Sequence, residues 1–329
     1  MADAEFGALR ALVLTAGLGT RLRPLTYLRA KAAVPINGTP LAVRTIDWLA
    51  AAGIRDLVLN LHHRPQTIAA LVGDGVDRGV RVRYSWEQPV LGSAGGPRRA
   101  LPLVTDDDED DFLIVNGDTL TDLDIRPLVA RHRACGALVT MALIENPRPE
   151  QYGGVVLDGE GWVRGFAPRL PAGAGAGART YHFIGVQVAK ARAFSALADG
   201  VPAESVNSLY PQLIAADSRS IAAHVTGASF LDIGTPRDCL ETTLLLAGRE
   251  GARLVGAGTA IHASAALERT AVWDDVSVAA GALLRDCVVG DGVAIPAGSS
   301  FERCAIVPAA GRQANGDEWI EGDLLLRRL

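Results

Sequence analysis

Residues 14–26 read Leu-Thr-Ala-Gly-Leu-Gly-Thr-Arg-Leu-Arg-Pro-Leu-Thr, and Lys31 follows ten positions after Arg21. An apolar run directly before this stretch is typical of a buried strand, so Gly17 and Gly19 lie where a strand turns into the next element. Glycines let the backbone approach a ligand closely, and the N–H groups of such a loop attract phosphate oxygens. Because Arg21 can bind a phosphate through two N–H groups and Lys31 adds a point charge, the stretch predicts a phosphate-binding loop.

Around this loop, roughly the first 245 residues alternate strand and helix patterns, which indicates a layered α/β sheet. The apolar runs that predict strands are 57–61, 80–84, 112–116 and 137–144. A turn at Asn37-Gly38 precedes a helix expected from Pro40, and a hairpin is expected over 153–166. The Gly- and Ala-rich stretch 171–178 has low complexity and predicts a linker.

From Leu254 the pattern changes to three 17-residue units, 254–270, 271–287 and 288–304. Stacking the units aligns three apolar columns: Val255, Val272, Val289 and Ile306; Ile261, Val278 and Ile295; and Leu267, Leu284 and Phe301. Such columns indicate coils that bury apolar side chains against one another. We expect deletion of the chain after residue 252 to impair assembly or stability before chemistry.

Three side chains of the repeats have chemical alternatives. Cys287 and Cys304 share a column and should lie about 4.8 Å apart, one strand spacing. A disulfide or a metal pair would fit there, but a stack of small inward-facing side chains is the preferred interpretation. His262 alone does not indicate the base of an acyltransferase, and we interpret it as structural.

Composition limits the function classes. The chain has 329 residues, of which 49% are hydrophobic and 21% charged, as expected for a globular protein with a large core. Its 32 basic and 37 acidic residues give a net charge of −5, which argues against general attraction to nucleic acid. The N-terminus lacks the basic region of a signal peptide, and no apolar run is long enough to cross a membrane. Four cysteines without close pairing favour reduced thiols and a cytoplasmic location.

Two aspartates follow apolar runs. Asp118 ends the segment Phe-Leu-Ile-Val-Asn-Gly-Asp at 112–118, and Asp232 lies in Phe-Leu-Asp-Ile-Gly-Thr-Pro, just before a helix expected at Pro236. Ligands of open parallel sheets bind beyond the carboxyl ends of the strands, where such residues lie. Taken alone, each aspartate could instead be a turn residue or a helix cap. The acidic run 106–111 is a rival by composition, but we interpret it as a solvated surface loop.

The loop resembles the signature of the sugar-1-phosphate nucleotidylyltransferases, also called NDP-sugar pyrophosphorylases. That signature is Gly-x-Gly-Thr-Arg-x-x-Pro-x-Thr with a Lys ten residues after the Arg, and both parts match from Gly17 to Lys31. Proline usually follows that Lys in the family, whereas here Ala32 follows it. The repeats resemble the left-handed β-helix tail with hexapeptide repeats that many of these enzymes carry, so the resemblance extends to about residue 308.

The resemblance implies a fold, a domain division and an assembly. We expect a Rossmann-like nucleotidyltransferase domain with a mostly parallel central sheet over 1–250 and a short left-handed parallel β-helix over 251–308. Residues 309–329 would form a C-terminal tail without a readable motif. A homo-oligomer formed through the β-helix tail is possible on this resemblance.

The resemblance also implies the reaction, in which a sugar 1-phosphate attacks the α-phosphorus of a nucleoside triphosphate and pyrophosphate leaves in line. The attacking phosphate has a second pKa of about 6, so it needs no general base. The implied catalytic residues are Arg21, Lys31, Asp118 and Asp232, and the two aspartates would bind Mg²⁺. The implied nucleotide-binding residues are Ala16, Gly17, Gly19, Thr20, Arg21, Lys31, Glu87, Gly92, Ser93 and Gly117.

The base and sugar assignments come from two further matches. Residues 87–96 resemble the family segment Glu-x-Pro-Leu-Gly-Thr-Ala-Gly, whose backbone reads the base edge. Residues 152–156 and 181–188 resemble segments that meet the sugar. The implied sugar-phosphate contacts are Gly153, Arg169 and Gly185. Arg169 stands in place of the Lys of the family's Glu-Lys-Pro motif, and the Glu of that motif is missing.

Several alternatives remain. A dinucleotide-dependent dehydrogenase would need a third glycine where Leu22 stands, and a hexapeptide acyltransferase would need more coils. A catalytically inactive homologue that senses nucleotide sugars should have lost one of the four implied catalytic residues. Among substrates, GTP and mannose 1-phosphate are preferred. N-acetylmuramate-1-phosphate uridylyltransferases and glucose-1-phosphate thymidylyl- or uridylyltransferases are the alternatives.

Overall fold

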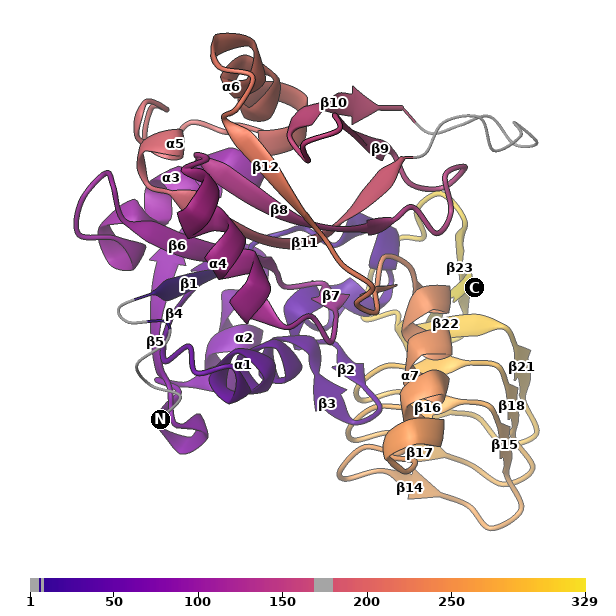
Figure 1. The fold of residues 1–329 in the computed structure, drawn as a ribbon. Helices are drawn as coiled ribbons and strands as arrows, with labels where there is room; N and C mark the ends of the chain where they lie inside the picture. The colour runs from indigo at the N-terminus through magenta and orange to yellow at the C-terminus, as the bar shows by residue number, and fades with distance from the viewer. Residues whose placement is uncertain (1–5, 7–8, 169–179) are drawn as a thin grey trace. The chain divides into compact units, whose positions relative to one another are not determined.

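The computed structural model describes Phe6 and residues 9–168 and 180–329 (Figure 1). The chain forms two compact units. Unit 1 contains Met1–Gly17, Thr45–Pro65 and Val72–Phe230, and unit 2 contains Leu18–Arg44, Gln66–Leu71 and Leu231–Leu329. The signature loop beyond Gly17 therefore belongs to the same unit as the repeats. The domain division at residue 250 stays a prediction.

Unit 1 is built on a mixed sheet whose main path has the strand order β10-β9-β11-β6-β1-β4-β5, while β8 pairs with β11 and β12. The strands are β1 (Arg10–Leu14), β4 (Asp56–Leu61), β5 (Arg81–Trp86), β6 (Asp111–Asn116), β8 (Val139–Glu145), β9 (Gly154–Leu157), β10 (Val163–Ala167), β11 (Tyr181–Lys190) and β12 (Ile221–Val225). β6, β1, β4 and β5 are parallel, and β11 runs antiparallel to β6 and β8. This arrangement confirms a Rossmann-like fold with a mixed, mostly parallel sheet.

The strand order explains where a ligand would bind in unit 1. From β1 the chain continues to β4 and β5 on one side, whereas β6 pairs with β1 on the other side. The carboxyl ends of β1 and β6 are therefore neighbours at the switch in strand order, where open α/β sheets bind ligands. Phe112, Leu113, Ile114 and Val115 of β6 are buried, because a parallel sheet is covered on both faces.

Helices and short elements complete unit 1. They are α1 (Leu41–Ala51), α2 (Pro65–Val72), η4 (Val76–Arg78), α3 (Gly92–Val104), β7 (Thr119–Leu120), α4 (Ile125–Cys135), α5 (Arg192–Ser195), η5 (Ser205–Leu209) and α6 (Tyr210–Ala216). α1 and α2 each contain residues of both units. α3 packs against β1, β4 and β5, and α4 packs against β8, β11 and β12. Within the described residues, no helix is both long enough and apolar enough to cross a membrane.

The non-repeat part of unit 2 contains the signature loop and one long helix. Its elements are η1 (Thr20–Leu22), η2 (Leu25–Tyr27), η3 (Lys31–Ala33), β2 (Pro35–Ile36), β3 (Thr39–Pro40), β13 (Leu231–Asp232) and α7 (Pro236–Glu250). The turn at Asn37-Gly38 is confirmed, because both residues have positive φ. The helix start at Pro40 was wrong, since Pro40 pairs with Pro35 and α1 begins at Leu41. α7 starts at Pro236 as predicted, with Thr235 and Asp238 forming a capping box.

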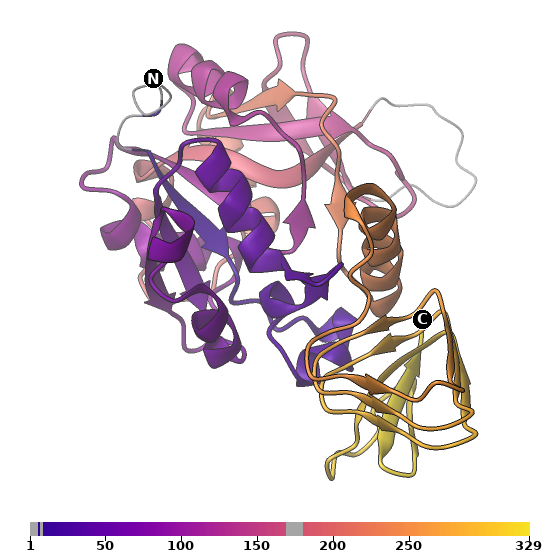
Figure 2. The same ribbon diagram turned by 90° about the horizontal axis from the view of Figure 1, so that it is seen from below.

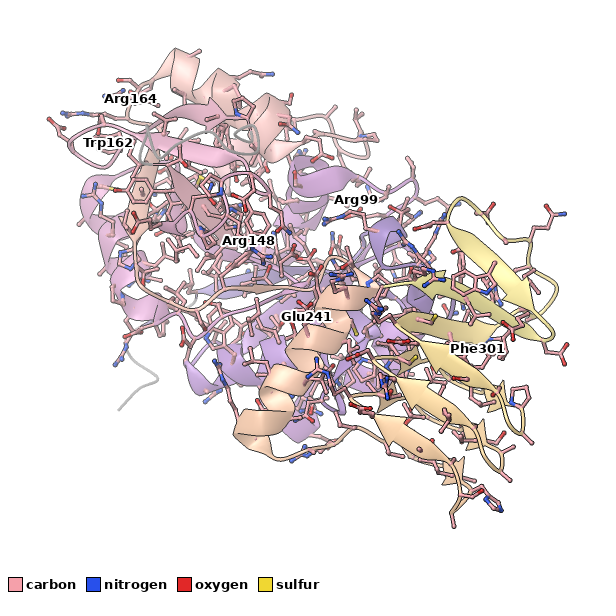
Figure 3. The ribbon with its side chains drawn as sticks, turned by 90° about the vertical axis from the view of Figure 1, so that its right-hand side faces the viewer. Arg99, Arg148, Trp162, Arg164, Glu241 and Phe301 are labelled. Carbon is pink, nitrogen blue, oxygen red and sulfur yellow. The ribbon has the colours of Figure 1, made fainter. Side chains whose placement is uncertain are left out.

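The C-terminal strands β14 to β22 stack as parallel ladders, and β23 and β24 are added to the last ladder in antiparallel pairing (Figure 2). They are β14 (Ala260–Ile261), β15 (Ala266–Glu268), β16 (Ala271–Val272), β17 (Ser277–Val278), β18 (Leu283–Arg285), β19 (Val288–Val289), β20 (Ala294–Ile295), β21 (Ser300–Glu302), β22 (Cys304–Pro308), β23 (Glu318–Glu321) and β24 (Leu324–Arg328). The register confirms all three apolar columns, including the one that ends at Phe301 (Figure 3). Cys287 and Cys304 are free thiols buried in this core, as expected.

The end of the chain, in which the sequence showed no motif, is ordered. β24 pairs antiparallel with both β22 and β23, so residues 318–328 extend the last ladder of the repeats. Leu324, Leu325 and Leu326 are buried there. The apolar run that begins at Leu324 is therefore part of the core of unit 2, and the side chain of Arg327 follows directly after it.

Candidate active site

In unit 1, the adjoining ends of β1 and β6 place the first group of predicted residues. Leu14 pairs with Asn116, and Gly117 N–H donates to the Leu14 carbonyl at 3.0 Å. A Cβ at Gly117 would lie 2.7 Å from that carbonyl oxygen, so only glycine allows this approach. The half-buried Asp118 thus leaves β6 close to the point where the chain leaves β1 toward Ala16 and Gly17.

A buried asparagine that the sequence analysis did not single out holds this edge together. Asn60, near the end of β4, accepts hydrogen bonds through Oδ1 from the N–H groups of Thr15 at 2.5 Å and Ala16 at 3.2 Å. Its Nδ2 donates to Glu87 Oε1 at 2.6 Å. Asn60 is only 3% exposed, so its amide links the loop after β1 to the loop after β5 without access to solvent. The signal in the sequence is a polar residue inside the apolar run 57–61.

Glu87 holds the loop that is predicted to contact the nucleotide base. The carboxylate of Glu87 is buried, and its two oxygens accept hydrogen bonds from Asn60 and from Leu91 N–H at 2.7 Å. Both oxygens are thus engaged within the protein, which suits a positioning role. That Glu87 binds the nucleotide stays a prediction.

Gly92 and Ser93, at the start of α3, lie beside the exposed Glu204. Ser93 Oγ donates to Glu204 Oε2 at 2.7 Å and accepts from Ser205 N–H at 2.9 Å. A Cβ at Gly92 would lie 2.6 Å from Glu204 Oε1, and the φ of Gly92 is +77°. Because the Ser93 hydroxyl is engaged, the backbone N–H groups at 92–93 are the better candidates for ligand contacts. Sequence reasoning missed Glu204, since no motif marks it.

Of the two glycines predicted to meet the sugar, Gly185 lies in β11, and Gly153 directly precedes β9, which pairs with β11. Gly185 has a φ of +79° at an irregularity in the pairing of β11 with β8, and a Cβ there would lie 2.8 Å from the Asn116 side chain. Gly153 is exposed, and its backbone hydrogen-bonds with His182. The ring of His182 lies 4.4 Å from that of Tyr152 and 4.6 Å from that of Phe230.

The His182 ring is poor in polar partners. Among the described residues, its Nδ1 is one of the buried side-chain atoms without a hydrogen-bond partner. Burial lowers the pKa of His182 from 6.5 to about 4, although the hydrogen bond with Gly153 opposes the shift. His182 is therefore neutral near neutral pH. The third predicted sugar-phosphate residue, Arg169, lies outside the described residues.

In unit 2, the signature loop folds back on itself around Gly19. Gly19 has a φ of +60°, and its carbonyl accepts hydrogen bonds from Leu22 N–H at 3.0 Å and from Thr26 Oγ1 at 2.9 Å. A Cβ at Gly19 would lie 2.8 Å from Thr26 Cγ2 and 3.2 Å from Lys31 Cβ. The spacing of the signature thus has a physical reason: its second glycine makes room for its last threonine and for the following lysine.

Arg21 and Asp232 come together over Gly234. A Cβ at Gly234 would lie 3.1 Å from Arg21 Nη1 and 3.2 Å from Asp232 Oδ2. Gly234 is buried, whereas Arg21 is exposed and Asp232 half-buried. Two of the four predicted catalytic residues, 211 positions apart in the sequence, therefore share one surface of unit 2, and Thr20 is exposed beside Arg21.

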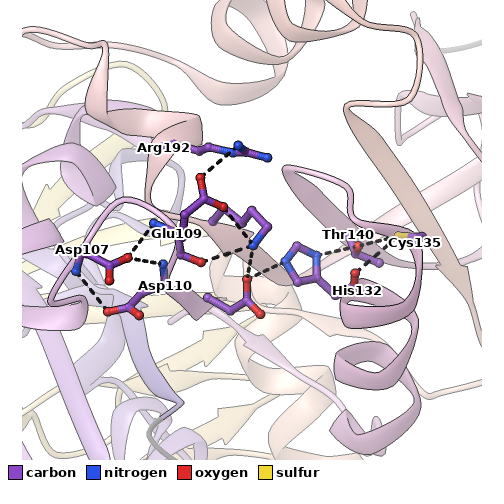
Figure 4. A network of polar contacts seen from close by, with 9 residues as sticks. Asp107, Glu109, Asp110, His132, Cys135, Thr140 and Arg192 are labelled. Carbon is purple, nitrogen blue, oxygen red and sulfur yellow. Dashed lines mark hydrogen bonds and ion pairs between the residues drawn. The ribbon is translucent and has the colours of Figure 1, made fainter.

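Residues 106–110 of the acidic run form a surface loop, as predicted, whereas Asp111 begins β6 and its half-buried carboxylate contacts His132 Nε2 at 3.1 Å. Asp106 pairs with Arg10 at 2.7 Å, and Glu109 pairs with Arg192 at 2.9 Å. The carboxylates of Asp107 and Asp110 accept backbone N–H groups of the same loop (Figure 4). The run thus satisfies its charges with its own backbone and with neighbouring cations.

The donors available for a metal ion are few. Within the described residues, no group of three or more His, Cys, Asp or Glu side chains could hold a metal ion. Asp118 and Asp232 each offer one carboxylate. A hard divalent ion that keeps several waters and takes substrate phosphates as ligands needs only one or two carboxylates from a protein, whereas a structural zinc site needs four protein ligands.

Comparisons with known proteins identify the family of the chain. The nucleotidyl transferase family matches residues 10–249, so the chain belongs to that family. It is 29% identical over 269 residues to the mannose-1-phosphate guanylyltransferase of Mycobacterium tuberculosis, covering 78% of this chain and 72% of that enzyme. It is 28% identical over 261 residues to the mannose-1-phosphate guanyltransferase of Kluyveromyces lactis, covering 75% and 68%.

Solved structures share the fold. A putative glucose-1-phosphate thymidylyltransferase from Bacillus anthracis, in complex with sucrose, matches with a TM-score of 0.62 at 18% identity, covering 72% of this chain and 94% of that one. HddC from Yersinia pseudotuberculosis, complexed with GMP-PN, matches with a TM-score of 0.60 at 21% identity, covering 72% and 99%. The relatives are sugar-1-phosphate nucleotidyltransferases, and this chain is an enzyme of that class.

Proposed function

We propose that this enzyme joins GTP and mannose 1-phosphate to form GDP-mannose and pyrophosphate. The observation that carries the proposal is that Asp232 of β13 and Arg21 of the signature loop both lie next to Gly234, while Gly19 of that loop packs against Thr26 and Lys31. This is the charge pattern that a triphosphate and its metal ion require. The choice of GTP and mannose 1-phosphate is supported by the named activities of the curated relatives from M. tuberculosis and K. lactis.

In this proposal the chain aligns the substrates and neutralises charge. The N–H groups around Gly17 and Gly19 and the Arg21 guanidinium bind the phosphates that leave as pyrophosphate. Lys31 stabilises charge that develops on the triphosphate. The sugar 1-phosphate arrives already ionised and attacks the α-phosphorus in line, so the protein contributes orientation and electrostatic stabilisation but no proton transfer.

Nucleotidyltransferases of this family generally use a divalent metal ion. We propose Mg²⁺, held by Asp118 and Asp232 together with substrate phosphates and water. When bound, the ion supplies charge neutralisation between phosphate groups. Within unit 2, the close approach of Arg21 to Asp232 supports this assignment, because cation and carboxylate would then meet the same phosphates.

Nucleotide and sugar contacts complete the proposal. Ala16, Gly17, Gly117, Gly92 and Ser93 contact the nucleotide through backbone groups, with Glu87 supporting the base loop. Gly153 and Gly185 contact the sugar, and Arg169 its phosphate. Support for the sugar side is the exposure of Gly153 and the positive φ of Gly185 next to Asn116.

For the rest of the molecule, we propose that the repeats form a left-handed β-helix through which the enzyme forms a homo-oligomer. The parallel ladders and the 17-residue register of three columns support a β-helix. A cytoplasmic location is supported by the four free thiols, which suit a reducing compartment.

The test is a matrix of substrates read by pyrophosphate release. GTP, UTP, dTTP and ATP are each paired with mannose 1-phosphate, glucose 1-phosphate and N-acetylmuramate 1-phosphate, with Arg21→Ala as the control. We expect the highest kcat/KM for GTP with mannose 1-phosphate and a large decrease in turnover, to a level that can still be measured, in the control. A higher kcat/KM for another pair would change the proposed substrates but leave the enzyme class unchanged. Nucleotide-sugar binding without any turnover would indicate the sensing homologue instead.

A further inference from the structure

The C-terminal strands of unit 2 hold the signature loop of the same unit in place. In η1, the carbonyls of Gly19 and Thr20 accept hydrogen bonds from Leu22 and Arg23 N–H within the turn. The carbonyls of Arg21 and Arg23 accept instead from Arg327, whose Nη1 donates to both, at 3.0 Å and 2.8 Å. A residue next to the end of the chain thus binds the backbone of the predicted catalytic arginine.

Arg327 is suited to hold a backbone in place. It lies on β24, paired with Ala305 of β22 on one side and Glu318 of β23 on the other, so its main chain is fixed by two ladders. Its Nε donates to Asp317 Oδ2 at 2.9 Å, which orients the guanidinium. The Arg327 side chain is 23% exposed, so its charge-assisted hydrogen bonds are partly shielded from water.

A second set of contacts, made by Arg29, holds the other end of the signature loop. Arg29 donates to both carboxylate oxygens of Asp291, at 2.7 and 2.6 Å, and to Asp274 Oδ2 at 2.6 Å. Its guanidinium also lies over the ring of Trp273, 5.4 Å from the centroid. Burial alone would lower the pKa of Arg29, but Asp291 and Asp274 outweigh burial and raise it. Arg29, which makes these contacts, lies two residues before Lys31.

The repeat itself creates these contacts. Asp274 and Asp291 are 17 residues apart, one repeat, so successive coils present two carboxylates to one arginine. Gly290 leaves room for Leu28, whose Cδ1 lies 2.5 Å from where a Cβ at 290 would be. The segment from Arg21 to Lys31, which the contacts of Arg327 and Arg29 hold, includes both predicted catalytic cations of the loop.

From this pattern we propose that Arg327 is a positioning residue for catalysis, which sets the backbone of the signature loop so that Arg21 meets the triphosphate. This inference rests on the proposed function of Arg21. It revises the expectation that losing the C-terminal strands harms stability before chemistry, because the end of the chain directly contacts the loop.

The experiment combines single and double variants of the full chain. Arg327→Ala removes both hydrogen bonds, Arg327→Lys keeps the charge and one donor group, and Arg328→Ala is the matched control. Arg328 is exposed, and its guanidinium lies over Trp319 rather than the loop. Turnover, KM for both substrates and melting temperature are measured for each variant, and Arg327→Ala is repeated in an Arg21→Ala background.

We expect Arg327→Ala to lower kcat on the order of 10- to 100-fold, since small misplacements of catalytic groups have effects of that size. Arg327→Lys should recover part of the loss, and Arg328→Ala should keep the activity of the parent enzyme. In the Arg21→Ala background, Arg327→Ala should lower kcat less than threefold, because it acts through Arg21.

Equal kcat values for Arg327→Ala and Arg328→Ala would overturn the inference. So would a loss of kcat in Arg327→Ala that is fully repeated in the Arg21→Ala background, since a merely structural role predicts independent effects. If Arg21→Ala itself leaves turnover unchanged, the proposed function of Arg21 fails, which is a separate result.

Discussion

In unit 1, the predicted site residues are placed mainly by strands, whereas in unit 2 they are placed mainly by side chains. Gly117 and Asp118 follow β6, whose ladder with β1 fixes their position through backbone hydrogen bonds. Arg21 lies in a short 3-10 turn whose backbone is bound by Arg327, 306 positions away. Residues predicted for one function can therefore depend on very different parts of the chain for their position.

The largest effect on kcat is expected from removing one carboxylate in each unit. We expect Asp118→Asn and Asp232→Asn each to lower kcat about 10³-fold, about 4 kcal/mol of transition-state stabilisation, because each would remove a metal ligand. Pyrophosphate release across a Mg²⁺ titration measures the effect, and circular dichroism checks the fold. Parental turnover in either variant would remove that residue from the metal site.

Removing the Asn60 side chain should show how much unit 1 depends on one buried amide. Asn60→Ala removes the side-chain partner of Glu87 Oε1 and of the Thr15 N–H, while Glu87 Oε2 keeps its hydrogen bond from Leu91 N–H. We expect a loss of about 2–4 kcal/mol in the free energy of unfolding and a higher KM for the nucleotide. Urea denaturation measures the first effect, with the exposed Asn207→Ala as control. A loss no larger than that of the control would contradict the role of Asn60.

The two signature glycines provide a sharper contrast. In the part of the chain that the structure describes, no atom beyond the two chain neighbours of Gly17 lies within 4 Å of a Cβ placed there, while Gly19 has a positive φ and is crowded by Thr26 and Lys31. Gly19→Ala should therefore destabilise the protein by about 1–3 kcal/mol. Gly17→Ala should keep stability but raise the KM for the nucleotide, because only a bound ligand would meet the new methyl group. Unchanged KM in a stable Gly17→Ala variant would mean that no phosphate approaches Gly17.

The sequence predicts features that rest on local patterns, and it does not predict contacts between residues that are distant in the chain. β1, β6 and the three repeat columns were readable because apolar runs and periods are local patterns. The helix start at Pro40 was wrong because the Asn37-Gly38 turn pairs Pro40 with Pro35. Asn60, Glu204 and Arg327 were missed because each acts on a residue far away in the sequence. The polar Asn60 inside the apolar run 57–61 marks a special residue but not its partners, and nothing local in the sequence marks Glu204 or Arg327.

The smallest expected effect concerns the pH dependence of stability in unit 1. His182 has a folded pKa of about 4, against about 6.5 in the unfolded chain, so between these values the unfolded state binds more protons. Stability contributed by neutral His182 is therefore present above about pH 6.5 and falls as the pH decreases toward 4. His182→Phe should reduce this slope in thermal unfolding, whereas His262→Phe, on an exposed coil, serves as control. An unchanged slope would show that His182 is not the group responsible.

The central claim is that the loop from Gly17 to Lys31 binds the triphosphate. A crystal structure of the full chain with a non-hydrolysable GTP analogue and Mg²⁺ tests it most directly. We expect phosphate oxygens within about 3 Å of the Gly17–Gly19 N–H groups and the Arg21 guanidinium. A nucleotide bound elsewhere, with this loop free of phosphate, would contradict it.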